Sequence, residues 1–180
     1  GGIEAVRASR RLSRGARGAL SARIEDYGLV GDPQTAAPVS RDGCIDWLCL
    51  PRFDSGAVFA SLLGDAANGH WTLQPEGDFR STGRGYRGDT LVLETELETD
   101  SGSVRLVDFM PPRETKPDLV RIVEGARGRV EMRMELALRF DYGSIVPWVR
   151  RQEGGIVAVA GPDGIVLRTP VELVGRDLHT

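Results

Sequence analysis

The sequence of 180 residues carries 41% apolar and 27% charged side chains, which is an ordinary composition for a soluble globular chain with one core. No stretch approaches the roughly 20 apolar residues that a membrane-spanning helix requires, and the first 23 residues lack the apolar middle of a secretory signal. These features exclude a membrane protein and make the cytoplasm the expected location.

The net charge of −3 is unevenly distributed. Residues 1–23 hold six arginines against one glutamate, a local sum of +5 that leaves −8 for the remainder. An anionic partner such as nucleic acid is one interpretation of a basic segment. No aromatic residue is interleaved with these arginines to stack on bases, so we expect residues 1–23 to be a flexible basic leader or an artificial extension, and we expect no nucleic acid as partner. Residues 24–180 should form the folded domain.

The first predicted elements are two strands joined by a tight turn. Two apolar runs, 36–39 and 44–50, flank Asp42-Gly43, and Asp-Gly supplies the positive φ that a hairpin turn needs. Pro51 lacks an amide hydrogen and ends the second run, so residues 52–55 should leave the sheet as an ordered loop. We expect chemistry, if the chain has any, on this loop.

Both cysteines of the chain fall on the second of these runs. Cys44 and Cys49, five residues apart on one strand, would be roughly 16 Å apart at about 3.3 Å per residue. A disulfide needs α-carbons within roughly 7 Å, so two packed, reduced thiols are predicted. With only two histidines and no Cys-x-x-Cys pair, the sequence predicts neither a metal site nor a cofactor.

The middle of the chain mixes turn signals with one clear strand. Residues 57–63 predict a short helix, 69–73 a strand closed by Pro75, and 77–89 a turn-rich connection. Over residues 91–98 an apolar set alternates with an acidic one, which indicates a half-buried strand. Its three glutamates, on one face, could bind cations or sugar hydroxyls, although a solvated outer face is favoured.

The rest of the chain repeats strand and turn. A strand is predicted at 104–109, and Pro111-Pro112 ends it. Another strand at 119–123 is followed by a turn at 125–128. The turn leads into a long strand with apolar residues at every second position from Val130 to Phe140. Further strands follow at 145–151, 155–160 and 165–169, with Pro162-Asp163-Gly164 as a hairpin turn, and Trp71 and Trp148 are expected in the core or an interface. This rhythm predicts an all-β antiparallel β-sandwich with at most one or two short helices.

Three blocks of the sequence carry a family resemblance. They are GLVGD followed by TAAPVSRDGCIDWLCLPRFDS at 28–55, YRGDTLVLET at 86–95, and VDFMPPR at 107–113. In order and spacing they resemble the N-terminal domain of bacterial trehalase-like and glucoamylase-like enzymes of glycoside hydrolase family fifteen. The resemblance implies a supersandwich-like fold and a parent enzyme that hydrolyses α-glucosidic bonds, such as those of trehalose, with inversion. It also implies that the catalytic glutamates lie in an (α/α) barrel that follows this domain as its partner in the same chain, so this chain alone should be non-catalytic.

The loop predicted after Pro51 supplies the candidate site. Asp46 and Asp54 are carboxylates of the type that glycoside hydrolysis uses, but their spacing does not decide whether they lie close together. Trp47, Arg52, Phe53 and Asp54 combine aromatic surface, a guanidinium and a carboxylate, which suits packing on sugar rings and hydrogen bonding to hydroxyls. The alternative is structural: Trp47 lies in the core, Arg52 pairs with Asp54 or another acid, and the loop is a rigid docking element.

Two other classes of function stay open. The chain could be an independent carbohydrate-binding module, or a structural or assembly domain, and the sequence does not decide whether it forms a homo-oligomer. His70, beside Trp71, is expected to be structural.

Overall fold

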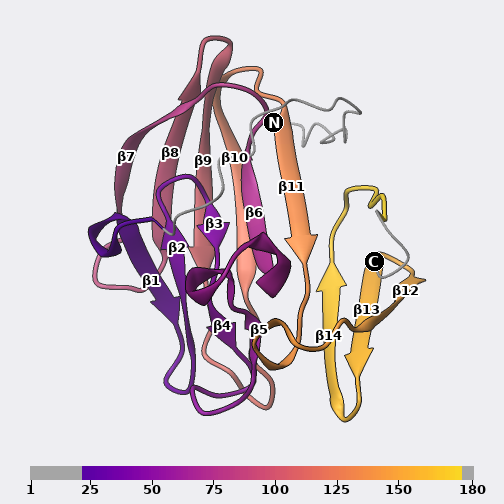
Figure 1. The fold of residues 1–180 in the computed structure, drawn as a ribbon. Coiled ribbons are helices and arrows are strands. Elements are labelled where there is room, and N and C mark those ends of the chain that lie inside the picture. Colours follow the sequence, from indigo (N-terminus) through magenta and orange to yellow (C-terminus); the bar gives the residue numbers. More distant parts are fainter. Residues whose placement is uncertain (1–21, 176–180) are drawn as a thin grey trace.

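A computed structural model describes residues 22–175, and its regular structure there is almost entirely antiparallel strand (Figure 1). Most of the predicted leader 1–23 and the last five residues of the predicted domain 24–180 lie outside the described range. The expectation of an all-β fold is confirmed.

The strands form two large sheets and two smaller groups. The five-stranded sheet has the order β1-β2-β3-β6-β11, the four-stranded sheet β10-β9-β8-β7 and the three-stranded sheet β12-β13-β14, while β4 and β5 pair with each other. The bounds are β1 Tyr27–Gly31, β2 Ala36–Ser40, β3 Cys44–Ile45, β4 Leu48–Cys49, β5 Ala57–Phe59, β6 His70–Pro75, β7 Arg80–Tyr86, β8 Leu93–Thr99, β9 Gly102–Phe109, β10 Val120–Gly128, β11 Met132–Ala137, β12 Trp148–Gln152, β13 Gly155–Ala160 and β14 Asp163–Arg168.

Helical structure in the described range is limited to four three-residue 3-10 turns: η1 Ile24–Asp26, η2 Ser61–Leu63, η3 Ala66–Asn68 and η4 Asp141–Gly143. The helix predicted over 57–63 is wrong. Residues 57–59 form β5, in which all three side chains are buried, and only η2 turns. A surface helix of seven residues would bury only one face. In β5 all three successive side chains are buried, so tertiary packing overrides the local helix preference.

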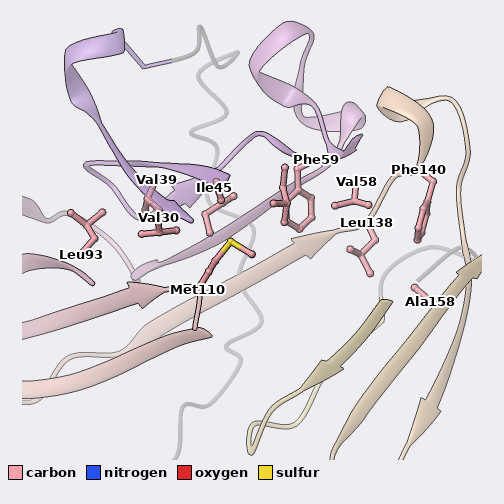
Figure 2. Close-up of a cluster of buried hydrophobic side chains, with 12 residues drawn as sticks. Val30, Val39, Ile45, Val58, Phe59, Leu93, Met110, Leu138, Phe140 and Ala158 are labelled. Atoms are coloured by element: carbon pink, nitrogen blue, oxygen red, sulfur yellow. The ribbon is translucent and has the colours of Figure 1, made fainter. Parts of the chain in front are cut away.

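The core lies between the five-stranded and four-stranded sheets and extends to the three-stranded one. Leu73 and Met132 of the first sheet pack with Leu97, Val104 and Leu106 of the second. A second, larger cluster, drawn in Figure 2, joins Val30, Val39, Ile45, Leu93 and Met110 to Val58, Phe59, Leu138, Phe140 and Ala158 of β13. The apolar sides of alternating strands therefore build a sandwich, as predicted.

The alternation in β8 has the predicted outcome. Leu93, Thr95 and Leu97 are at most 1% exposed, whereas the glutamates between them point outward. Each glutamate meets arginine on the outer face: Arg87 with Glu94, Arg105 with Glu94 and Glu96, and both Arg80 and Arg127 with Glu98. The acidic face is thus matched by cations of neighbouring strands, and exposed pairs of this kind contribute little to stability.

Two segments predicted as turns are strands. Residues 77–89 contain the edge strand β7, which has an irregular register between Ser81 and Gly83, and residues 125–128 are the end of β10, with a bulge of its own. Gly128 requires glycine both for its positive φ of 65° and for close approach to backbone, whereas Gly83 approaches only the flexible end of the Glu96 side chain. A Cβ at Gly83 would lie 2.9 Å from Glu96 Oε2, and one at Gly128 would lie 2.2 Å from Ser101 O.

Two predicted strands are shorter than expected. The run 44–50 splits into β3 and β4, which belong to different sheets, so Cys44 and Cys49 do not share a strand; both thiols are free. The run 130–140 is a strand only over β11, although Leu138 and Phe140 beyond it remain buried, as the period-two pattern requires. The last hairpin turns at Gly161-Pro162, because Asp163 already pairs with Ala160.

One buried and one half-buried arginine connect the two large sheets. Arg121 of β10 donates to Trp71 O at 2.9 Å and to Gly43 O at 2.8 Å, lies 5.2 Å above the Trp71 ring centroid, and pairs with Asp108 at 2.8 Å. Its side chain is 1% exposed and that of Asp108 is fully buried. Arg84 of β7 likewise donates to Asp26 O and Val39 O. Each guanidinium thus donates hydrogen bonds to backbone carbonyls of the opposite layer.

Candidate functional site

The loop after β4 is ordered, as predicted. It follows a cis Leu50–Pro51 peptide, and its backbone is fixed at several points. The amide of Phe53 donates to Gln34 O at 2.9 Å, that of Ser55 to Arg52 O at 3.1 Å, and Arg113 Nη1 to Pro51 O at 2.7 Å. A loop held in this way presents its side chains in one geometry, which a binding surface requires.

A buried ion pair between Arg113 and Asp32 stabilises the loop. Arg113 contacts both carboxylate oxygens of Asp32, at 2.6 and 2.9 Å, and the two side chains are 8% and 0% exposed. Burial disfavours ionisation of Asp32. The hydrogen bonds from Arg113 and from the amides of Gln34 and Thr35 outweigh this and lower the pKa of the carboxyl. Arg113 thus ties the Pro51 carbonyl to a charged anchor in the β1–β2 connection.

On the loop itself, Arg52 pairs with Asp54. The Nε–Oδ1 distance is 2.9 Å, and the side chains are 61% and 75% exposed. The hydrogen bond from Arg52 lowers the pKa of Asp54, which is therefore ionised at neutral pH. Phe53, between them, is 62% exposed. This is the pairing that the structural alternative anticipated, but it leaves all three side chains accessible to a ligand or a neighbouring domain.

Trp47 lies just before β4 and contacts Tyr142. Its ring packs against the buried side chains of Cys49, Ala57 and Ala60, and its centroid is 5.9 Å from that of Tyr142. Trp47 is only partly buried and Tyr142 is 48% exposed. The four candidates are therefore arranged as an exposed trio, Arg52 to Asp54, and a half-buried indole whose aromatic neighbour comes from η4.

The backbone that carries Tyr142 adopts an uncommon conformation. Asp141, Tyr142 and Gly143 all have positive φ, at 49°, 59° and 101°. Asn68 Nδ2 donates to Tyr142 O at 3.1 Å, and Ser144 Oγ donates to Asp141 O at 2.7 Å. Non-glycine residues in this region cost free energy and persist where surrounding contacts fix them, often at functional sites. Sequence reasoning missed Tyr142, because nothing local connects it to a tryptophan 95 positions earlier.

Asp46 and Asp54 do not share an environment. Asp46 is 7% exposed and accepts a hydrogen bond from the hydroxyl of Tyr27, while its Oδ1 has no hydrogen-bond partner among the described residues. Burial raises the pKa of Asp46, although the Tyr27 hydrogen bond opposes the shift. One carboxylate is therefore enclosed beside a tyrosine and the other is paired on an exposed loop.

Three further titratable groups lie on the same side of the five-stranded sheet as Asp46. Burial, together with the charges of Asp46 and Asp42, raises the pKa of Cys44 to about 12. His70 is 8% exposed, with Nδ1 3.2 Å from Ala66 O and Nε2 3.6 Å from Glu135 Oε1. The hydrogen bond with His70 lowers the pKa of Glu135 to about 2, although partial burial opposes this shift. His70 and Glu135 thus have structural partners within the fold.

We expect Tyr27→Phe to destabilise the chain by about 1 to 3 kcal/mol at pH 7, because the buried Asp46 carboxylate loses its donor. Since burial raises the pKa of Asp46, the loss should shrink at low pH, where the carboxyl is neutral. Urea unfolding at pH 7 and pH 4 measures both effects. Tyr142→Phe is the matched control, because Tyr142 is 48% exposed and its hydroxyl has no hydrogen-bond partner among the described residues. Equal losses in the two variants would contradict the assignment.

Neither a metal-binding cluster nor a membrane-spanning helix occurs within residues 22–175. No group of three or more histidine, cysteine, aspartate or glutamate side chains there is placed to hold a metal ion, and no helix of that range is long and apolar enough to cross a membrane. A hollow of about 280 Å³ lies on the outer face of the four-stranded sheet and is lined by Thr82, Glu96, Glu98, Ser103, Val104, Ala126 and Arg127. None of the candidate site residues lines it.

Comparison with known proteins identifies the family. A family model described as trehalase-like, N-terminal, matches residues 10–174. The chain belongs to this family. A trehalase of Mycolicibacterium smegmatis is 35% identical over 138 residues, covering 66% of the chain and 20% of the relative. A trehalase of Thermoplasma volcanium is 30% identical over 149 residues (79% and 24%), and Trehalase 1 of Sulfolobus acidocaldarius is 33% identical over 133 residues (74% and 22%). No solved structure matches significantly.

The trehalase-like N-terminal domain therefore spans only a fifth to a quarter of the length of these relatives. Within it, the three sequence blocks contact one another. Asp32 of the first block pairs with Arg113 of the third, and the Tyr86 hydroxyl of the second bonds to both N and O of Leu29 at 2.8 and 3.0 Å. The blocks thus have a structural reason to occur together, because they hold the β1–β2 connection and the Pro51 loop in place.

Proposed function

We propose that this trehalase-like N-terminal domain is the non-catalytic β-sandwich of a longer glycoside hydrolase of family fifteen that hydrolyses α-glucosidic bonds, those of trehalose first, with inversion. The observation that carries the proposal is the match to an N-terminal family by a chain that covers a fifth to a quarter of relatives named trehalase. The catalytic carboxylates then belong to a helical barrel that follows this domain. A cytoplasmic location stays a prediction, and the oligomeric state stays open.

The arrangement of carboxylates supports a non-catalytic role. Inversion needs a general acid and a general base roughly 6.5 to 9.5 Å apart, with room for a water and a sugar between them. Asp46 is enclosed beside Tyr27, and Asp54 is paired with Arg52 on the surface. The 180-residue chain alone should therefore release no glucose from trehalose.

The second part of the proposal concerns the loop. We assign to it the bracing of the barrel and one edge of the sugar pocket, with Trp47, Arg52, Phe53 and Asp54 as the contributing residues. Its support is the combination of an accessible aromatic ring and a charged pair on a backbone that Arg113 and Gln34 hold in one conformation. Such a loop can meet a sugar or a second domain with little further loss of backbone conformational entropy.

In the full-length enzyme, Arg52→Ala and Asp54→Ala should each raise the KM for trehalose by about tenfold, the effect of losing roughly 1.4 kcal/mol of binding. Stability should change little, because the pair is exposed. Initial rates and urea unfolding measure the two effects. Arg80→Ala, which removes an equally exposed arginine paired with Glu98, is the control. Wild-type kinetics together with wild-type stability in both loop variants would remove the loop from function.

An independent carbohydrate-binding module is the alternative that the exposed aromatic side chains Phe53 and Trp148 favour. Titration of the 180-residue chain with trehalose and maltooligosaccharides separates the two functions. Saturable heat with the chain alone would favour the module, and its absence the supporting domain.

A further inference from the structure

The inner face of the four-stranded sheet carries two polar side chains among its leucines. Thr95 of β8, which lies between Leu93 and Leu97 on this face, is 0% exposed, and so is Asp108 of β9. Thr95 Oγ1 and Asp108 Oδ2 are buried and have no hydrogen-bond partner among the described residues. An unpaired oxygen in an apolar interior is costly, which indicates that a group other than the protein completes the hydrogen bonding here.

The strand register places these two oxygens near each other. Thr95 lies directly across from Leu106, and Asp108 stands two residues farther along β9 on the same face. The α-carbons of such diagonal neighbours are about 7 to 8 Å apart, and their side chains approach more closely. One water bridges two oxygens that are about 4.5 to 5.5 Å apart, because each of its hydrogen bonds is about 2.7 to 2.8 Å long. The register therefore suits a bridging molecule of this size.

A hydrogen-bond donor comes from β7. Arg84 lies directly across from Thr95, and its two terminal guanidinium nitrogens donate to Asp26 O and Val39 O. The remaining nitrogen, Nε, is buried and finds no acceptor within residues 22–175. Burial lowers the pKa of Arg84, and the Asp108 carboxylate is among the charges that oppose this shift, so the two side chains interact through the interior.

We propose that a water molecule binds between the two large sheets, where it accepts a hydrogen bond from Arg84 Nε, donates one to Asp108 Oδ2 and shares a third with the Thr95 hydroxyl. The three unpaired groups are one donor, one acceptor and one hydroxyl that can be either. They match a buried water, which typically makes about three hydrogen bonds. The carboxylate disfavours an anion at this position, and the guanidinium groups disfavour a cation. Thr95, shorter than the two leucines beside it, is the position on this face where a molecule of about 30 Å³ finds room.

This water extends the connection between the layers, and the inference does not depend on the proposed function. Arg121 of β10 binds the other oxygen of Asp108 and donates to Trp71 O of the five-stranded sheet. The water joins Asp108 to Arg84 in turn. One hydrogen-bonded network then crosses the four-stranded sheet from β7 to β10 and reaches the opposite sheet through an arginine at each end.

Thr95→Val tests the proposal through the sign of its effect on stability, because valine keeps the branched shape of threonine and removes the hydroxyl. The folding equilibrium constant of the 180-residue chain should fall about fivefold in urea unfolding, the effect of losing one hydrogen bond. Thr35→Val is the matched control: Thr35 is also 0% exposed, its hydroxyl donates to Cys49 O at 2.6 Å, and the loss should be of similar size. An unchanged or higher stability of Thr95→Val would mean that its hydroxyl is unpaired in a dry interior and would overturn the inference.

Oxygen-17 magnetic relaxation dispersion counts the waters that a protein holds for longer than it takes to tumble. Proteins contain about one buried water per 27 residues, so the informative quantity is the difference between two variants. Wild type should hold about one long-lived water more than Thr95→Val, whereas Thr35→Val should match wild type. Equal counts in wild type and Thr95→Val would contradict the proposal.

A crystal structure of the wild-type chain gives a result that needs no variant. A water within about 3.2 Å of both Thr95 Oγ1 and Asp108 Oδ2 would support the site. Direct hydrogen bonds from protein groups to both oxygens, or no water between them, would refute it.

Discussion

Arg121→Met should destabilise the domain by about 3 to 5 kcal/mol, lowering Tm by roughly 10 °C. The Asp108 carboxylate is fully buried and receives its hydrogen bond from Arg121, while its Oδ2 has no hydrogen-bond partner among the described residues. Without the guanidinium, a charge stays buried and uncompensated, the Trp71 carbonyl loses a donor, and the Gly43 carbonyl keeps only the Leu73 amide. Urea unfolding followed by circular dichroism measures the loss.

Arg127→Met is the matched control for this prediction. Arg127 lies on the same strand, but its side chain is 68% exposed and pairs with Glu98 on the surface, so the expected loss is below about 0.5 kcal/mol. The double variant Asp108→Leu/Arg121→Met should regain part of the stability, because no unpaired charge remains. If Arg121→Met cost no more than Arg127→Met, the two sheets would not depend on this connection.

Arg113→Met should cost about 3 kcal/mol and should also loosen the loop after Pro51. Asp32 would be left buried without its cation, and the Pro51 carbonyl without its donor. Hydrogen exchange separates the two effects. The Phe53 amide, which donates to Gln34, should exchange at least tenfold faster than the global destabilisation explains, while amides of β8 and β9 follow the global change. Arg52→Met, at the exposed pair, should leave global stability within about 0.5 kcal/mol.

The same pair gives a pH dependence with a defined sign. Despite burial, the hydrogen bonds to Asp32 lower its pKa in the folded state below the unfolded value. Its contribution to stability is therefore complete above about pH 4, the unfolded pKa, and is lost as the pH falls through the folded one. In Asp32→Asn this part of the acid destabilisation should be missing. An unchanged slope of stability against pH below 4 would contradict the role of Asp32.

Much of the fold could be predicted because the alternation of apolar residues within a single strand indicates which face of that strand is buried. The Asp42-Gly43 turn and the alternation of β8 depend on neighbours in the sequence, and the structure has both. The connections between layers could not be predicted. Asp108 sits among apolar residues of β9 and Arg121 in β10, and a polar residue at an inward position is normally taken as evidence against a buried face. The glycines of β7 and β10 led to wrong turn predictions, because glycine is favoured both in turns and where backbones pack closely.

In the candidate site, too, the local features could be predicted and the long-range contacts could not. The loop and its Arg52–Asp54 pair are local, since the proline and a spacing of two residues determine them, and the structure has both. Tyr142 and the Arg113 anchor come from elements far along the chain, and only the folded topology brings them there. Trp148 was expected in the core or an interface; its 79% exposure makes the core interpretation wrong.

The buried environment of the cysteines has a practical consequence. Burial raises the pKa of Cys44 to about 12 and also raises that of Cys49, so both thiols stay protonated at neutral pH. Because the thiolate is the species that reacts with oxidants and alkylating agents, both sulfurs should be chemically quiet. The domain should keep its fold equally well in oxidising and reducing surroundings and tolerate storage in air without a reductant.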